Sequence, residues 1–312
     1  MNKIQNFPIM LFTTIMGLGG LSMDIFYIFG AGFLFESFRF VTAALFVLLF
    51  ICYGLKILLF RNSVKAELHH PIKINFFPAF SISLLLLAAR FSAFSGVSKA
   101  LFYAGVASQS IITLYVISAW ISRDINIEHS NPAWFIPVAA NLLIPALVPF
   151  DAPWTWFYFS FALFFYVVIF TLLFYRLIFH PSLESKFIPT LFIFIAPPSV
   201  AFLGYEKLAR FDNFALILLN IAIFFALLLC FMYKKFLRLK FALSWWAFTF
   251  PLATFCLALL KAAHLGIFLL TLVSLSLACF VFLCFCVLLA RLKAWLKAQL
   301  LKLKSRIPSK FI

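Results

Sequence analysis

The side chains that could perform catalysis or bind a metal are few and scattered along this sequence. The nine acidic residues fall mostly between apolar segments, and the five histidines are similarly peripheral. No apolar segment carries two carboxylates, or a carboxylate and a histidine, at the helical spacing that a metal cluster or a general acid and base need. The sequence therefore predicts no enzyme, no metal site and no other cofactor.

One spacing does link an aromatic residue to a basic residue. Lys261 follows Phe250 by eleven residues, which returns to within about 20° of the same helix face, about 16 Å further along. If Phe250 faces a pore, Lys261 lies at the outer mouth, where Arg90 could join it and favour anions. The alternative is that both bases reach to the membrane surface or pair with Asp24 and Glu206.

The elements that position these residues must lie in lipid. Hydrophobic residues make up 66% of the 312 residues and charged residues only 11%, more apolar surface than a soluble core could use. Ten continuously apolar segments are long enough to cross a bilayer as helices, which excludes a β-barrel. They span residues 7–30, 36–60, 73–95, 98–121, 131–149, 154–178, 188–207, 211–233, 244–264 and 265–291.

The net charge of +16 is distributed as in a membrane protein. With the N-terminus inside, nineteen of the twenty-five Lys and Arg residues fall on the inner side. This asymmetry predicts that both termini are cytoplasmic, as expected for a multi-pass protein of the bacterial inner membrane. The positive charge therefore does not indicate nucleic-acid binding.

The prolines divide the ten segments into two classes. Nine of the fourteen prolines lie in odd-numbered segments and none lies in an even-numbered one. Bent helices are tolerated at membrane depth only where neighbours or a cavity satisfy the freed carbonyls. We therefore expect five helical hairpins, with five inner, proline-kinked helices around a central pore and five outer helices. The candidate kink or pore-lining prolines are Pro78, Pro137, Pro197, Pro198 and Pro251.

The ninth segment contains the strongest candidate for a pore gate. Pro251 removes the hydrogen bond to the Ala247 carbonyl and bends the helix directly after Phe250. We expect this bend to turn Phe250 toward the pore, although an ordinary core phenylalanine is the alternative. In the first segment, Gly17 permits close approach either of a permeating ion or of a neighbouring helix.

The chain ends in a basic, amphipathic stretch. Residues 1–290 form the predicted transmembrane channel domain, and residues 291–312 a cytoplasmic tail that lies on anionic membrane lipid. The six cysteines lie in or beside apolar segments and are expected to be packing residues.

Five motifs in the odd segments carry a family resemblance. They are NFPIMLFTTIMGLGGL, HPIKINFFPAFSISLLLL, NPAWFIPVAANLLIP, IAPPSVAFLGY and SWWAFTFPLATF. In order and position they resemble the tellurite-resistance/dicarboxylate transporter family, which includes bacterial TehA proteins and the slow anion channels of plant guard cells.

The resemblance implies a homotrimer with a pore in each protomer, occluded by a phenylalanine of the ninth helix that matches Phe250. It also implies small inorganic anions such as chloride and nitrate as permeating species. Phe12, in the first motif, is another candidate pore-lining residue. The first motif departs from the family pattern directly after it, because Thr13 and Thr14 stand where a glycine is expected.

Two transport functions remain open on the sequence alone. The leading hypothesis is a passive, anion-selective channel gated by Phe250. The alternative is a proton-coupled transporter of dicarboxylates or oxyanions such as malate or tellurite, because a carrier needs the same bent-helix interior.

Overall fold

The fold is an all-helical bundle in the part of the chain that the computed structural model describes, residues 4–237, 239–240 and 242–263. Its α-helices are α1 (Phe12–Phe29), α2 (Phe33–Leu59), α3 (Arg61–His69), α4 (Pro78–Arg90), α5 (Ser95–Ser122), α6 (Ile136–Leu147), α7 (Thr155–Phe179), α8 (Ala196–Ala209), α9 (Asn213–Phe231), α10 (Lys234–Leu237) and α11 (Thr249–Ala263). The 3₁₀ helices are η1 (Ile9–Leu11), η2 (Lys73–Phe76), η3 (Ile127–His129), η4 (Pro132–Phe135), η5 (Ile188–Ile195) and η6 (Leu243–Phe248).

Multiple helices fit a multi-pass membrane protein. Among the described residues, eight helical stretches are long and apolar enough to cross a bilayer, and Pro132–Leu147 is a shorter apolar one. These nine correspond to the first nine predicted segments. The tenth segment and the basic tail lie outside the described residues.

The odd-numbered segments share one local structure, a short 3₁₀ helix, here called the 3₁₀ leg, followed by an α-helix. Proline stands at this junction in four of them, at the first to third residue of α4, α6, α8 and α11. Because proline lacks an N–H and its ring blocks the carbonyl four residues earlier, α-helical bonding cannot continue across it, and the preceding turn adopts the tighter 3₁₀ pattern.

The first segment makes the same junction without proline. There, the Thr13 hydroxyl donates to the Met10 carbonyl and the Thr14 hydroxyl to the Leu11 carbonyl, both at 2.7 Å. These two bonds occupy carbonyl oxygens at the point where η1 becomes α1. The threonines that depart from the expected motif therefore stabilise the junction.

Burial separates the helices into two groups. In the segments that contain α1, α4, α8 and α11, between 78% and 89% of the residues in the most apolar 18-residue stretch are buried. In Pro132–Leu147, every residue except Ala146 is buried. The corresponding share is only 28% to 33% in α2, α5, α7 and α9. The second group therefore presents most of its surface outward.

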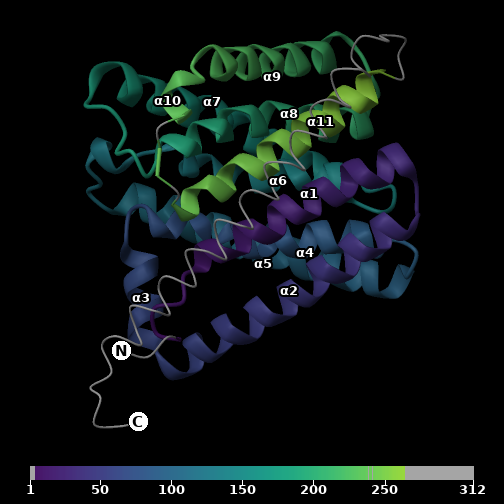
Figure 1. Cartoon of the computed structure of the whole chain (residues 1–312), viewed down its shortest axis with the longest axis horizontal. Coiled ribbons are helices and arrows are strands. Elements are labelled where there is room, and N and C mark those ends of the chain that lie inside the picture. The colour runs from purple at the N-terminus through teal and green to yellow at the C-terminus, as the bar shows by residue number, and fades with distance from the viewer. Residues whose placement is uncertain (1–3, 238, 241, 264–312) are drawn as a thin grey trace.

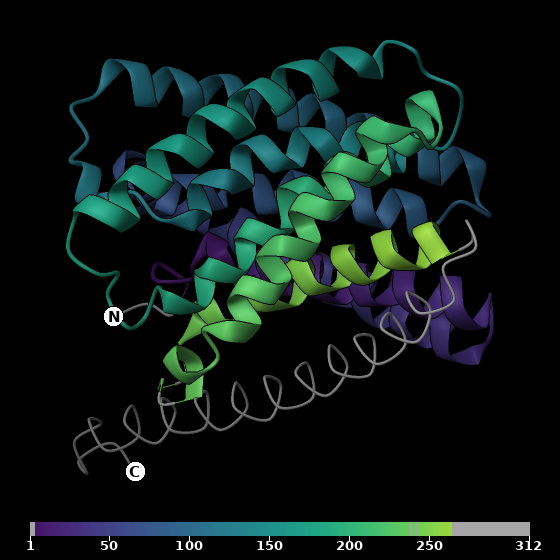
Figure 2. The same ribbon diagram turned by 90° about the horizontal axis from the view of Figure 1, so that it is seen from above.

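The five buried helices contact one another in a closed cycle, α1 to α4, α4 to α6, α6 to α8, α8 to α11 and α11 to α1. Their 3₁₀ legs also contact one another in sequence from η1 to η6, η3 excepted, so the legs gather at one end of the bundle. Figure 1 shows α1 and α11 side by side, with α2 and α9 at opposite edges of the molecule. Figure 2 shows the long helices running lengthwise through the molecule, inclined to one another.

The longest element that was not expected from the sequence is a helix in the loop after the second predicted segment. The chain between the second and third predicted segments forms the helix α3, which contacts α2 and η2. A buried ion pair between Lys56 of α2 and Glu67 of α3 connects the two helices.

Candidate functional site

Two cavities lie along the interior of the five-helix cycle. The smaller, about 30 Å³, is lined by residues of all five buried segments, among them Thr13, Ile82, Ala139, Ala196 and Phe250. The larger, about 130 Å³, is also lined by all five helices, among them Gly20, Leu86, Leu147, Leu203 and Phe250. On α1 and α11 the smaller cavity uses the earlier residues and the larger cavity the later ones, so the two follow one another along the bundle.

Phe250 and Leu143 are the two residues that line both cavities. The Phe250 side chain is 5% exposed, and its ring lies beside Gly20, where an added Cβ would be 3.6 Å from the ring carbon Cδ2. The ring of Phe250 and the side chain of Leu143 therefore stand between the two cavities.

Hydroxyl groups hold the backbone on both sides of Phe250. Thr249 donates to the carbonyl of Trp246 at 2.9 Å, at the start of α11. Thr254 donates to the carbonyls of Phe250 and Pro251 at 3.1 and 3.0 Å. Local side-chain bonds thus hold the backbone of the first turns of α11 on both sides of Pro251.

All five predicted prolines stand where a 3₁₀ helix meets an α-helix, and Pro251, third in α11, also lines the smaller cavity beside Phe250. Of the other four, Pro78 is first in α4, Pro137 second in α6, and Pro197 and Pro198 second and third in α8. None of these four is among the residues that line the two axial cavities.

Gly17 and Phe12 lie away from the two cavities. A Cβ added to Gly17 would lie 2.8 Å from the Cβ of Thr249, so this glycine lets α1 and α11 approach closely. The ring of Phe12 packs edge-on against Phe46, Tyr53 and Phe80, on the side of α1 that faces α2 and α4.

Of the two predicted mouth charges, Lys261 reaches a cavity. It lines the larger cavity, and its Nζ lies 2.5 Å from Oε2 of Glu206 in α8. The two side chains are 29% and 32% exposed, so the pair is only partly removed from solvent. The lysine therefore pairs with Glu206, as the second alternative expected, and it also lines the larger cavity, while its place at a pore mouth stays a prediction.

Arg90 is buried instead, opposite a buried acid. Arg90 is 2% exposed and Asp24 is 0% exposed. Within the described part of the chain, neither Asp24 oxygen accepts a hydrogen bond, nor do Nε and Nη2 of Arg90 donate one, and Arg90 is the charged group that acts on Asp24. Ionisable side chains buried inside a membrane protein cost free energy and are commonly functional.

Several cavity-lining residues were not singled out from the sequence. Met16, Met23 and Tyr27 line one cavity or the other, and they recur along α1 at intervals of seven and four residues. That interval places them on one face of a helix and was the available signal. It could not be distinguished from an ordinary packing stripe.

Among the described residues there is no group of three or more potential metal-binding side chains.

Comparison with known proteins assigns the chain to a family. The family model described as "SLAC1: Voltage-dependent anion channel" matches residues 6–292. The S-type anion channel SLAH3 of Arabidopsis thaliana is 32% identical over 72% of this chain, and SLAH2 of the same plant is 31% identical over 68%. The chain spans only 36% and 42% of the lengths of these two relatives.

An archaeal relative matches over nearly its full length. An uncharacterized transporter of Methanocaldococcus jannaschii is 26% identical, with 81% of this chain and 82% of the relative covered. These relatives are named as channels and transporters, not as enzymes. With the match over residues 6–292, the chain belongs to the SLAC1 family of voltage-dependent anion channels.

Proposed function

We propose that this protein is an anion-selective channel whose pathway runs along the interior of the five buried helices and is closed by Phe250. Small inorganic anions such as chloride and nitrate are the permeating species. The observation that carries this proposal is that Phe250 lines both axial cavities, so its ring separates two spaces that would otherwise adjoin.

Selectivity for anions is supported by charge at both ends of the bundle. The 3₁₀ legs gather at one end, and they are the N-terminal starts of the five buried segments. Helix N-termini carry partial positive charge, which attracts anions. At the other end, the Lys261 side chain lines the larger cavity and brings its positive charge to the cavity wall, while its partner Glu206 is not among the lining residues.

The arrangement in the membrane follows from the same proposal. The five buried helices form the inner ring of five hairpins, and the outward-facing helices contact lipid or neighbouring protomers of a homotrimer. Both termini lie in the cytoplasm. The apolar exposed side chains of the outer helices, such as Phe157 and Phe224, support such contacts, because a water-facing surface would not carry them in this density.

Reversal potentials test anion selectivity directly. The purified protein is reconstituted in planar bilayers with unequal chloride, nitrate or malate on the two sides. A channel for small anions gives currents that reverse near the equilibrium potential of chloride or nitrate and that follow anion replacement. Currents that follow the cation gradient, or no current from any variant, contradict the proposal.

A second candidate function, a proton-coupled carrier, is favoured by one observation. Asp24 is a fully buried carboxyl group in α1, of the kind that serves as a proton relay in transporters. A carrier of this type shows saturable malate uptake that acidifies the vesicle interior, with little unitary current. Asp24→Asn abolishes the acidification. A conductance of Asp24→Asn equal to that of the wild type excludes the carrier.

A further inference from the structure

An apolar groove of about 400 Å³ lies away from the axial cavities, on the outer side of the bundle. Side chains of α2, α3, α4 and α5 line it together with η1 and Phe12. Phe50, Ile57 and Ile111 belong to its walls and are each about half exposed or more, so the groove opens on the outward surface. A membrane-spanning protein presents such a surface to lipid.

The helix α3 closes one end of this groove and carries positive charge beside it. Val64 and Leu68 of α3 line the groove. At 100° per residue, Arg61 and Lys65 lie about 60° and 100° from Val64 around the helix, on the side away from Glu67. Both side chains are exposed.

A third base lies at the same end of the groove. One guanidinium nitrogen of Arg123, Nη1, donates to the Leu68 carbonyl at 3.0 Å, and the other, Nη2, to the Tyr115 hydroxyl at 3.4 Å. Leu68 and Tyr115 both belong to the groove walls. Arg61, Lys65 and Arg123 therefore form a cationic rim at the α3 end of the groove.

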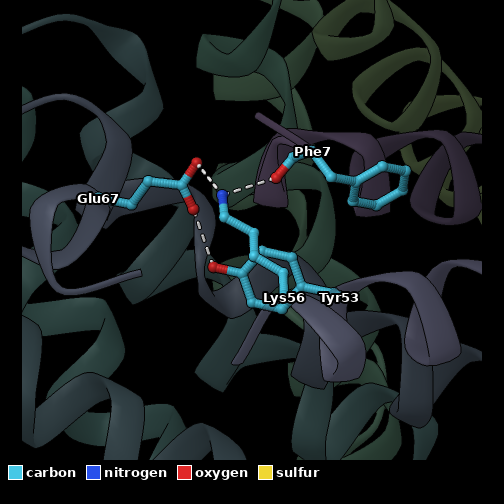
Figure 3. Close-up of polar contacts among 4 residues, drawn as sticks. All are labelled: Phe7, Tyr53, Lys56 and Glu67. Atoms are coloured by element: carbon cyan, nitrogen blue, oxygen red, sulfur yellow. Dashed lines mark hydrogen bonds and ion pairs between the residues drawn. The ribbon is translucent and has the colours of Figure 1, made fainter. Parts of the chain in front are cut away.

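The one acid of α3 is occupied elsewhere, as Figure 3 shows. Oε1 of Glu67 lies 2.8 Å from Nζ of Lys56, which also donates to the Phe7 carbonyl at 2.8 Å. Oε2 of Glu67 accepts from the Tyr53 hydroxyl at 2.9 Å. This network fixes α3 with Val64 and Leu68 toward the groove, and it leaves the cationic rim without a carboxylate from its own helix.

We propose that the groove binds an anionic phospholipid, with an acyl chain between α2 and α5 and the phosphate on the cationic rim. An acyl chain satisfies the apolar walls, and a phosphate group satisfies the bases. The apolar helix of a second protein copy would cover the walls but leave the rim unpaired. The combination of apolar groove and cationic rim matches an amphipathic, negatively charged ligand.

The bound lipid would touch the buried helices. Ile9 and Phe12 form part of the groove wall, at the junction of η1 and α1. The next residue, Thr13, lines the smaller axial cavity. An acyl chain in the groove therefore packs against the same helical turn that borders the proposed pathway.

Native mass spectrometry of the full chain tests this proposal without requiring channel activity. The detergent-purified protein is titrated with phosphatidylglycerol or with phosphatidylcholine of the same acyl chains. We expect the wild type to retain one phosphatidylglycerol per protomer, with at least severalfold preference over phosphatidylcholine. Arg61→Gln with Lys65→Gln removes the preference, because the headgroup loses two cationic partners.

A groove-filling variant tests the acyl-chain site separately. Gly54 lines the groove, and an added Cβ there meets no atom within 4 Å, so Gly54→Leu fills the groove without a clash at Cβ. We expect it to remove retention of both lipids. Gly96→Leu, at an equally open glycine in α5 outside the groove, and Lys234→Gln with Lys235→Gln in α10 are the matched controls and leave binding unchanged.

The proposal is overturned if Gly54→Leu binds lipid as the wild type does, or if both lipids bind equally well to the wild type. It is also overturned if no lipid is retained and Gly54→Cys cross-links between protomers, because a second copy would then occupy the groove.

Discussion

Gly17 of α1 and Thr249 of α11 lie in direct contact, and this contact determines how closely the two helices approach beside the proposed gate. A Cβ at position 17 would lie 2.8 Å from the Thr249 Cβ, and one turn later a Cβ at Gly20 would lie 2.8 Å from the Ala253 Cβ. Residues 17 and 20 thus face residues 249 and 253, so α1 and α11 run parallel. Phe250 follows directly after the first of these contacts.

Gly17→Ala is expected to destabilise the protein by about 1–3 kcal/mol, the usual cost of overpacking a close contact. The melting temperature in detergent measures this change. Gly54→Ala is the matched control, since its Cβ enters open space and alanine favours a helix more than glycine does. A Gly17→Ala protein as stable as Gly54→Ala would contradict the close packing of α1 and α11.

Glu67→Gln is expected to lower stability by about 3–5 kcal/mol, because it leaves the buried ammonium group of Lys56 without its counter-charge. Lys56 is 1% exposed, so solvent cannot replace the carboxylate. The control is Glu184→Gln, whose ion pair with Lys186 is more than half exposed and contributes little. Equal unfolding midpoints for the two variants would show that the Lys56 and Glu67 pair does not anchor α3.

Lys261→Gln is expected to reduce anion current, because it removes the positive charge from the wall of the larger cavity and leaves the nearby negative charge of Glu206 unpaired. A unit charge about 4 Å away acts with about 1 kcal/mol in water, which corresponds to a change of roughly fivefold. The difference shrinks as salt is raised, because mobile ions screen the charge. Lys99→Gln changes an exposed base that does not line either cavity and serves as the control. A Lys261→Gln current that matches the control at low salt would remove Lys261 from the pathway.

Acidification is expected to weaken the start of the third segment through His70. Its Nδ1 accepts hydrogen bonds from the backbone N–H groups of Ile72 and Lys73, at 3.2 and 3.4 Å. Burial lowers the pKa of His70 below its ordinary value of 6.5, and the nearby positive charges of Lys73, His129 and Lys186 add to this effect. The neutral ring is therefore favoured by folding.

The sign of the pH effect follows from that shift. The stability contributed by neutral His70 is fully present above pH 6.5 and is lost as the pH falls through the lower pKa of the folded state. The melting temperature should decrease on acidification more steeply in the wild type than in His70→Asn, whose amide oxygen can accept the same bonds without titrating. Identical slopes for the two proteins would contradict the role of the neutral ring.

The buried helices and most of their junctions could be predicted from the sequence, because proline acts locally. Its missing N–H and fixed ring interrupt α-helical bonding wherever it stands, so Pro137 and Pro251 marked their junctions without knowledge of the neighbours. The first segment has no proline at its junction, and nothing in its local pattern predicted that Thr13 and Thr14 serve the same purpose. Phe250 lines two cavities inside the bundle, while the direction of its ring toward a pore and its role as a gate stay predictions.

Long-range contacts explain what the sequence could not provide. Phe12 and Gly17 lie five residues apart in α1, and only their partners determine that Phe12 packs toward α2 and α4 while Gly17 packs on α11. The helix α3 is short and polar, and a contact between Lys56 and Glu67 orients it. Asp24 and Arg90 are far apart in the chain, so their mutual burial required the packing of α1 on α4.

The most direct test of the proposed pathway is the chloride conductance of Phe250→Ala compared with Phe255→Ala. Both replace a buried phenylalanine of α11, but only Phe250 lines the axial cavities. We predict currents in planar bilayers or oocytes that are several times larger for Phe250→Ala than for the wild type, and unchanged currents for Phe255→Ala. Equal chloride currents in the wild type and both variants would contradict the proposal that Phe250 closes the pathway.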